Sequence, residues 1–210
     1  MKIKEIFNSY EGEGDWQGLP CTFIRTHGCN KNCNYCDEKN DAHNYTNMTI
    51  EDIIAHYRTN ITTNKKRIVI TGGEPTLQID ELNELITKLK EIEPNTNIAL
   101  YTNGYKLNEV NHKPLHRIYL DIKEDELIPA GKSNYVFDVP LFDGKTKTKI
   151  VVSDDNYTKF MRLHTKVDII SPMLDANNKI LISIDNLNLL ANYHSEARIQ
   201  IQQHKILGYK

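Results

Sequence analysis

Residues 29–36 read Cys29-Asn30-Lys31-Asn32-Cys33-Asn34-Tyr35-Cys36, which places three cysteines at the spacing C-x3-C-x2-C. Thiols this close in sequence converge from one loop and favour a metal or redox site. The chain has four cysteines, all within residues 21–36, whereas a disulfide framework would spread them along the chain. Three ligands leave one coordination position open. That is a defect in a structural zinc site but useful in a catalytic iron–sulfur cluster.

Two simpler interpretations stay open on these residues alone. A zinc ion would need a fourth ligand, and Cys21, His27 and His43 are the candidates. Alternatively, the cysteines are merely buried. Cys21 follows Pro20 in a β-branched run, and we expect it to be a small buried hydrophobe rather than a ligand.

The composition describes an ordinary globular protein. The 210 residues are 39% hydrophobic and 26% charged, and this length favours a single domain over residues 1–210. Lys and Arg total 26 against 28 Asp and Glu, and the net charge of −2 argues against a nucleic-acid partner. No run of 18 apolar residues occurs, and residues 1–5 lack the apolar core of a signal peptide, so we expect a cytoplasmic protein with no membrane partner.

Short β-branched runs alternate with helical patterns. Strands are predicted over residues 21–26, 67–71, 97–102, 117–123, 148–153, 167–171 and 198–202. Helices are predicted from a capping box at Thr49 and Asp52 to about Arg58, and over 79–90, 154–163 and 184–193. The alternation predicts an α/β fold with a parallel sheet or partial barrel, whose catalytic groups collect at the C-terminal ends of the strands.

A second motif follows the strand predicted over 67–71. Thr71-Gly72-Gly73-Glu74-Pro75 combines glycines, which let backbone carbonyls approach a ligand closely, with a carboxylate that complements a cation. Alone, the motif is equally compatible with a turn between a strand and a helix. Its position one core strand after the cysteine segment favours the functional interpretation.

Together the two motifs resemble the signature of radical S-adenosylmethionine (SAM) enzymes. The resemblance implies an incomplete, trimmed (βα)6-type partial barrel with mostly parallel strands. It implies that Cys29, Cys33 and Cys36 are catalytic ligands of a 4Fe-4S cluster, whose open iron chelates SAM and whose electron cleaves SAM to a 5′-deoxyadenosyl radical. The SAM-binding positions that it implies are Tyr35, Asp37, Gly72, Gly73, Glu74, Asn103, Asp121, Lys123 and Ser171. For two of these a simpler reading remains, because Asn103 also suits an Asn-Gly turn and Lys123 a solvated position.

The flanking segments resemble the 7-carboxy-7-deazaguanine synthase family. The resemblance lies in residues 5–14 and 18–29, in 101–104, 149–153 and 171–173, and in the closing segment 198–208, so it spans nearly the whole chain. It implies a radical SAM lyase that converts 6-carboxy-5,6,7,8-tetrahydropterin to 7-carboxy-7-deazaguanine, with loss of ammonia, on the route to queuosine and other 7-deazapurines. It also implies Mg²⁺ as a further cofactor, a flavodoxin- or ferredoxin-like electron donor, and a homodimer.

The same resemblance suggests where the pterin binds. The turn Tyr10-Glu11-Gly12-Glu13 would present backbone groups and two carboxylates to ring N–H donors, Arg25 would pair with the substrate carboxylate, and Thr71 matches a family substrate contact. The simpler alternatives are a solvated turn for Glu11 and Glu13 and a surface ion pair for Arg25.

Three departures from the family pattern bear on its chemistry. Glu11 stands where Gln is common, and Asp37-Glu38 stands where Asp-Thr is common, the Thr being a Mg²⁺ ligand. Mg²⁺ favours carboxylate oxygen, so Glu38 is the candidate metal ligand here. Asp121-Ile122-Lys123 replaces an expected Ser-Pro-Lys and is reminiscent of glycyl-radical activating enzymes. An altered substrate or metal dependence therefore stays open.

Two alternative functions follow from these observations. A glycyl-radical-enzyme activase shares the cysteine spacing but has no reason to carry the Gly-Glu-Gly block of residues 12–14 or Gln203-His204-Lys205. A non-catalytic, metal-stabilised binding module would contain about one zinc ion and no sulfide.

Overall fold

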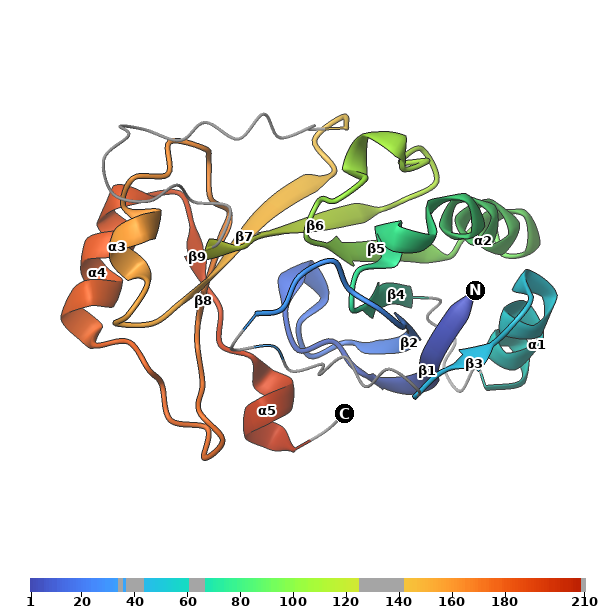
Figure 1. The fold of residues 1–210 in the computed structure, drawn as a ribbon, viewed down its shortest axis with the longest axis horizontal. Coiled ribbons are helices and arrows are strands. Elements are labelled where there is room, and N and C mark those ends of the chain that lie inside the picture. The colour runs from blue at the N-terminus through green and yellow to red at the C-terminus, as the bar shows by residue number, and fades with distance from the viewer. Residues whose placement is uncertain (34–35, 37–43, 61–66, 125–141, 209–210) are drawn as a thin grey trace.

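One sheet organises the chain. The computed structural model describes residues 1–33, 36, 44–60, 67–124 and 142–208, and within them nine strands form a sheet in the order β3-β1-β2-β4-β5-β6-β7-β8-β9 (Figure 1). β1 pairs with β2 and β3 in antiparallel fashion, and every pair from β2 to β9 is parallel. The strands are β1 (Lys2–Tyr10), β2 (Pro20–Thr26), β3 (Thr46–Asn47), β4 (Arg67–Gly72), β5 (Asn97–Thr102), β6 (Arg117–Ile122), β7 (Thr146–Val152), β8 (Ile169–Pro172) and β9 (Arg198–Ile199). An open, mostly parallel α/β sheet was predicted and is confirmed.

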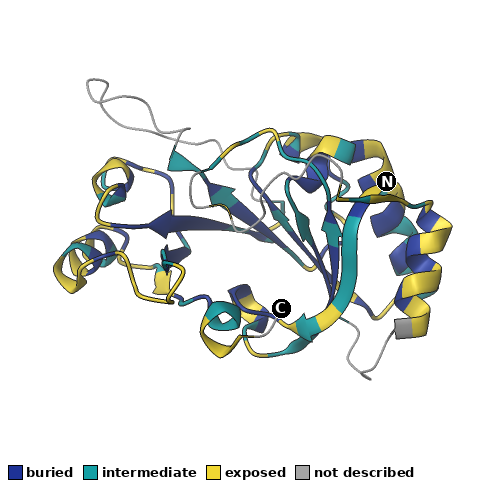
Figure 2. Cartoon of the chain, turned by 60° about the horizontal axis from the view of Figure 1, so that its bottom comes forward, coloured by how far each residue is buried: buried dark blue, intermediate teal, exposed yellow. Residues whose placement is uncertain are grey.

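Helices cover this sheet at both ends of Figure 1, with α1 and α2 near one end and α3 and α4 near the other. On α2 the side chains at helical spacing, Ile79, Leu82, Leu85, Ile86 and Leu89, are all buried, as an amphipathic helix requires (Figure 2). The helices are α1 (Ile50–Asn60), α2 (Ile79–Ile92), α3 (Tyr157–Phe160), α4 (Ile184–Tyr193) and α5 (Gln203–Leu207), with 3-10 turns η1 (Gly14–Trp16), η2 (Pro75–Gln78) and η3 (Leu107–Glu109).

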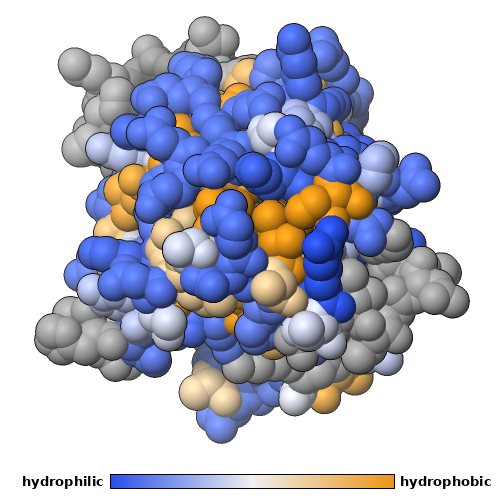
Figure 3. All heavy atoms as spheres, turned by 90° about the vertical axis from the view of Figure 1, so that its right-hand side faces the viewer, coloured by the Kyte–Doolittle hydropathy of each residue, from blue (hydrophilic) through white to orange (hydrophobic). Residues whose placement is uncertain are grey.

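A capping box begins helix α1, at the end of the sheet where α1 and α2 lie. The Thr49 hydroxyl accepts the Asp52 N–H at 3.1 Å and the Asp52 carboxylate accepts the Thr49 N–H at 3.0 Å, so the predicted capping box is confirmed. The molecular face on this side is mainly hydrophilic, with hydrophobic side chains in small groups (Figure 3). Among the described residues, no helix has the length and apolar character needed to cross a membrane.

The predicted helix over 154–163 is wrong in extent, because α3 covers only Tyr157–Phe160. The Asn156 side chain accepts the Ser153 N–H at 2.8 Å and donates to the Val151 carbonyl at 3.2 Å. Such side-chain bonds to nearby backbone compete with helix formation. β1 and α5 were not predicted, and the strand predicted over 198–202 ends at Ile199, after which the chain turns toward the N-terminal loop.

That N-terminal loop, residues 11–19, links the first strands to the last. Gly14 donates its N–H to Gln200 Oε1 and accepts from Gln200 Nε2, both at 2.9 Å and both buried. The Gln17 side chain donates to the Ile201 carbonyl at 2.8 Å. Gly14 has φ +69°, and a Cβ there would stand 2.6 Å from the Tyr101 hydroxyl, so glycine is required. The loop therefore joins sequence segments that lie nearly a whole chain apart.

We expect Gln200→Ala to lower the free energy of unfolding by about 2–4 kcal/mol, because it leaves the buried N–H and carbonyl of Gly14 without partners. Gln78→Ala is the matched control. Gln78 makes the same pair of bonds to the backbone of Lys2, but in exposed surroundings where water replaces them, and its loss should stay below about 1 kcal/mol. Urea unfolding measures both, and equal losses would contradict the prediction.

Candidate active site

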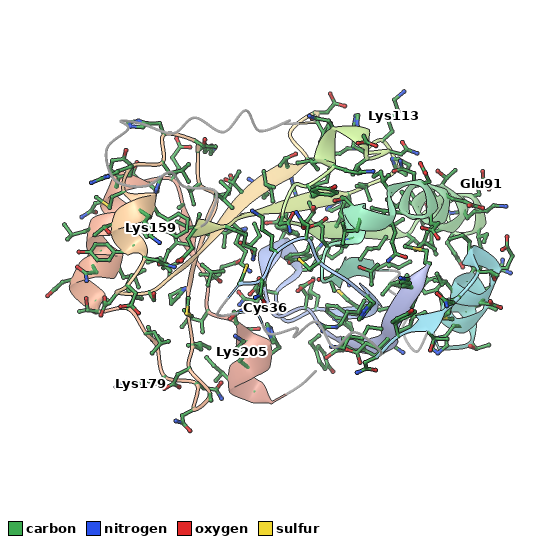
Figure 4. All side chains as sticks on the ribbon, in the orientation of Figure 1. Cys36, Glu91, Lys113, Lys159, Lys179 and Lys205 are labelled. Atoms are coloured by element: carbon green, nitrogen blue, oxygen red, sulfur yellow. The ribbon has the colours of Figure 1, made fainter. Side chains whose placement is uncertain are left out.

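A cavity of about 230 Å³ lies where the parallel strands β4, β5, β6 and β7 end. Most of the predicted site residues line it, and they come from strands and loops far apart in the sequence: Tyr10, Glu11, Gly12, Glu13, Arg25, Cys29, Cys33, Cys36, Thr71, Gly72, Gly73, Asn103, Asp121 and Lys123. Glu74 and Ser171 lie outside its lining, and both are fully buried. Tyr35, Asp37 and Glu38 fall outside the described residues. Figure 4 shows Cys36 near the middle of the molecule and Lys205 on α5, and both line this cavity.

The three cysteines face the cavity together. The Lys31 N–H donates to the Cys29 sulfur at 3.4 Å, and Asn103 Nδ2 lies 3.7 Å from it. Within the described residues, no group of three or more His, Cys, Asp or Glu is arranged closely enough to hold a metal ion. The donor set nevertheless fits an iron–sulfur cluster, since three thiols share one cavity and N–H donors are directed at a sulfur.

Cys21 lies apart from these three. It is buried in a cluster with Trp16, Phe23 and Val69, and its thiol donates to the Leu19 carbonyl at 3.5 Å. Burial, with a smaller contribution from the Glu11 carboxylate, raises the pKa of Cys21 to about 12. The expectation of a small buried hydrophobe is confirmed.

Gly72 and Gly73 pack directly on the start of the cysteine segment. A Cβ on Gly72 would lie 2.2 Å from the Thr26 carbonyl oxygen, and one on Gly73 would lie 2.0 Å from the Gly28 carbonyl oxygen. The Glu74 N–H donates to that same Gly28 carbonyl at 2.7 Å. Because only glycine fits these contacts, the two sequence motifs form one structural unit.

Glu74 holds the next strand end in place. Its buried carboxylate accepts from the hydroxyls of Thr76 and Thr102, each at 2.6 Å, and from the Asn103 N–H at 2.6 Å. These bonds place Asn103 beside Cys29. A SAM contact for Glu74 stays a prediction, and so does one for Ser171, whose hydroxyl donates to the Gln200 carbonyl at 3.1 Å.

A buried ion-pair network forms another wall. Lys149 contacts the Glu13 carboxylate and lies 3.9 Å from Asp121, which in turn pairs with Lys123 at 2.8 Å. Gln202 Nε2 donates to Glu13 at 2.5 Å. Burial opposes the charge of Glu13, but Lys149 and Gln202 outweigh it and lower its pKa, while the carboxylates likewise raise the pKa of Lys149 against the effect of burial.

Lys149 and Gln202 were missed as site residues. The available signal for Lys149 was a lysine directly before the apolar strand residues 150–152. A cation in such a run is buried only when a carboxylate meets it.

Glu11 and Glu13 are not in a solvated turn, so that alternative is wrong. Glu11 is 5% exposed, its Oε1 accepts the Glu13 N–H at 3.3 Å, and its Oε2 is buried with no partner among the described residues. Burial, and then the charge of Glu13, raise the pKa of Glu11 from 4.5 to about 8. The folded protein therefore holds a proton that the unfolded chain releases between these values, and Glu11 lowers stability as pH rises through that range.

Arg25 forms an ion pair, and its contact with the substrate carboxylate stays a prediction. Its Nε lies 2.9 Å from Glu5 and its guanidinium stands over the Phe7 ring at 5.5 Å. The side chain also lines the cavity, so the ion pair is at the site rather than on the open surface.

Residues 23–162 match the radical SAM superfamily, and the chain belongs to it. It is 33% identical to the 7-carboxy-7-deazaguanine synthase of Clostridium acetobutylicum, over 98% of this chain and 95% of the relative. It is 31% identical to the enzyme of that name from Methanospirillum hungatei, over 99% and 86%. Within the superfamily, the chain therefore belongs to the 7-carboxy-7-deazaguanine synthase family.

The fold agrees with this assignment. The crystal structure of QueE from Escherichia coli superimposes with a TM-score of 0.64 at 20% identity, covering 96% of this chain and 93% of that one.

We expect Lys149→Met to destabilise the protein by about 3–5 kcal/mol at pH 7, because it leaves Glu13 buried without its cation. The pKa of Glu13 is lowered in the folded state, so the contribution of the pair is present above pH 4.5 and is lost as pH falls. Urea unfolding of Lys149→Met, Glu13→Gln and the double variant measures the coupling. Additive losses, or an equal loss in the more exposed Lys123→Met, would refute the prediction.

Proposed function

We propose that this chain converts 6-carboxy-5,6,7,8-tetrahydropterin to 7-carboxy-7-deazaguanine, with loss of ammonia, in 7-deazapurine biosynthesis. The observation that carries the proposal is one cavity that joins three cysteines and a Gly-Gly turn to a buried polar wall made by Glu11, Glu13 and Lys149. Family membership supports the same reaction.

The cavity residues have different roles according to their chemistry. A 4Fe-4S cluster on Cys29, Cys33 and Cys36, with SAM bound, supplies the one-electron chemistry that starts the reaction. Gly72 and Gly73 line the same cavity, where backbone without side chains lets carbonyl groups approach a ligand closely.

The polar groups then hold the heterocycle. Ionised Glu13 accepts N–H bonds from the pterin, and its contacts with Lys149 and Gln202 fix the carboxylate in one orientation. Arg25 and Thr71 line the same cavity, where Arg25 pairs with the substrate carboxylate.

The alternatives are not favoured. A glycyl-radical-enzyme activase acts on a glycine within a protein, whereas buried carboxylates in a lined cavity suit a small planar ring with N–H groups. A non-catalytic, zinc-stabilised module is at odds with membership of an enzyme superfamily.

Three further assignments belong to this proposal. Mg²⁺ is the additional cofactor, with Glu38 as its ligand; the reductant is a flavodoxin- or ferredoxin-like protein; and the active form is a homodimer. Each rests on the family resemblance, and Glu38 lies outside the described residues.

Product formation is the direct test. We expect anaerobically reconstituted protein with SAM, reductant and the carboxytetrahydropterin to yield 7-carboxy-7-deazaguanine, identified by mass spectrometry. Cys29→Ala should lose both iron and product, whereas the control Cys21→Ala should keep both, because Cys21 lies off the cavity. Cleavage of SAM without this product would remove the pterin assignment, and a colourless zinc protein would remove the cluster.

Magnesium dependence tests the role of Glu38. We expect Mg²⁺ to stimulate the wild-type enzyme after chelation, because a carboxylate at residue 38 is a hard oxygen ligand. The comparison is the initial rate with and without Mg²⁺ in wild type and in Glu38→Thr. If Mg²⁺ stimulates only Glu38→Thr, Glu38 is not the substitute ligand.

A further inference from the structure

Glu11 and Glu13 are two residues apart in one loop, yet their surroundings differ in kind. Glu13 has a cation and an amide at its carboxylate, from Lys149 and Gln202. Glu11 Oε1 accepts the Glu13 N–H, the Gly12 N–H also favours the charged form, and Oε2 is buried without a partner in the described part of the chain. A carboxylate oxygen left in this position is strongly disfavoured unless it carries a proton or meets a ligand.

Burial and the charge of Glu13 outweigh the groups that favour a negative charge on Glu11, which are the N–H groups of Gly12 and Glu13 and the Lys149 cation. The titratable groups around Glu11 come from its own loop and from strands β2, β5, β6 and β7, together with α5: Glu13, Cys21, Tyr101, Tyr119, Lys149 and His204. Glu13 repels the charge, and Lys149 is directed to Glu13 and Asp121. The Tyr101 hydroxyl is a second buried polar atom without a partner among the described residues, and Tyr101 also lines the cavity.

We propose that Glu11 recognises the substrate as a neutral carboxylic acid that donates a hydrogen bond to a ring carbonyl oxygen, while the ionised Glu13 accepts ring N–H bonds. This role rests on the proposed function and makes Glu11 a specificity-determining residue of the same site. A pterin offers that pattern, because its lactam carbonyl adjoins N–H donors on one edge. Two ionised carboxylates would place an acceptor against the carbonyl oxygen and repel it.

The proposal also accounts for the departure at this position. Gln, which is common in the family at residue 11, has an N–H donor at the end of a side chain of the same length. A protonated Glu has an O–H donor in nearly the same place, whereas an ionised Glu has none. Glu11 thus performs the donor role of an amide only while it keeps its proton, and substrate affinity becomes dependent on pH.

The raised pKa of Glu11, about 8, sets the expected range. At a pH below this pKa, Glu11 carries the proton that it donates. At a higher pH, Glu11 must take up a proton when the substrate binds, so affinity falls by up to about tenfold for each further pH unit. Glu11→Gln keeps a donor at every pH and should show no such loss.

Binding of the carboxytetrahydropterin itself tests this role. Calorimetry on the reconstituted holoenzyme, without SAM so that no turnover occurs, gives the Kd from pH 6 to 9.5. Dividing the wild-type Kd by the Kd of Glu11→Gln cancels the pH dependence that comes from titration of the ligand itself. We expect a ratio near one at pH 7 that rises above pH 8. Glu11→Met, which has no donor, should bind weakly at all pH values.

Infrared difference spectra between wild type and Glu11→Gln provide a readout independent of substrate. A carboxylic acid carbonyl band present at pH 7 and lost at pH 9 supports the role, and its absence at pH 7 overturns it. A Kd ratio that stays constant with pH likewise overturns it. If no variant, wild type included, binds the pterin while the band is present, the proposed function fails and this recognition role fails with it, but the protonation of Glu11 stands.

Discussion

The two hydrogen bonds between Gly14 and the Gln200 side chain are the contact on which the site depends. They hold the N-terminal loop against the end of the last strand, in a sheet whose edge strands, β3 and β9, do not pair with each other in the described residues. Because the loop is fixed there, Glu11 and Glu13 are buried and line the cavity instead of extending into solvent. Without that attachment the carboxylates would be free to hydrate, and their different protonation states would disappear.

Because this wall of the cavity is buried, the positions of its charged groups determine the pKa values of its carboxylates. Lys149 lies between Glu13 and Asp121, and Lys123 pairs with Asp121, so positive and negative groups alternate across the wall. Among the described residues, Glu11 is the member of this group without a cation at its carboxylate. In a low-dielectric interior such differences separate the pKa values of similar side chains, and the proposed acceptor and donor roles of the two glutamates require that separation.

The cysteine segment depends on a different kind of contact. Gly72 and Gly73 pack against the backbone of Thr26 and Gly28, at distances that exclude any side chain, and Glu74 then fixes Thr102 and Asn103. The ends of β2, β4 and β5 are therefore locked to one another just where the three thiols enter the cavity. In this way the position of Cys29 depends on contacts made by residues of later strands.

The parallel α/β sheet, its core strands and the three-cysteine site could be predicted from the sequence, because strand periodicity and ligand spacing are local properties of the chain. The predicted helix over residues 154–163 was too long, because the Asn156 side chain hydrogen-bonds to nearby backbone. Lys149 and Gln202 were not predicted as partners of Glu13. The burial of Glu11 and Glu13, and the pairing of Glu13 but not Glu11 with a cation among the described residues, came from contacts between distant segments. The physical reason is that ionisation depends on desolvation and on neighbours brought from distant strands, and neither is written in the spacing of a segment.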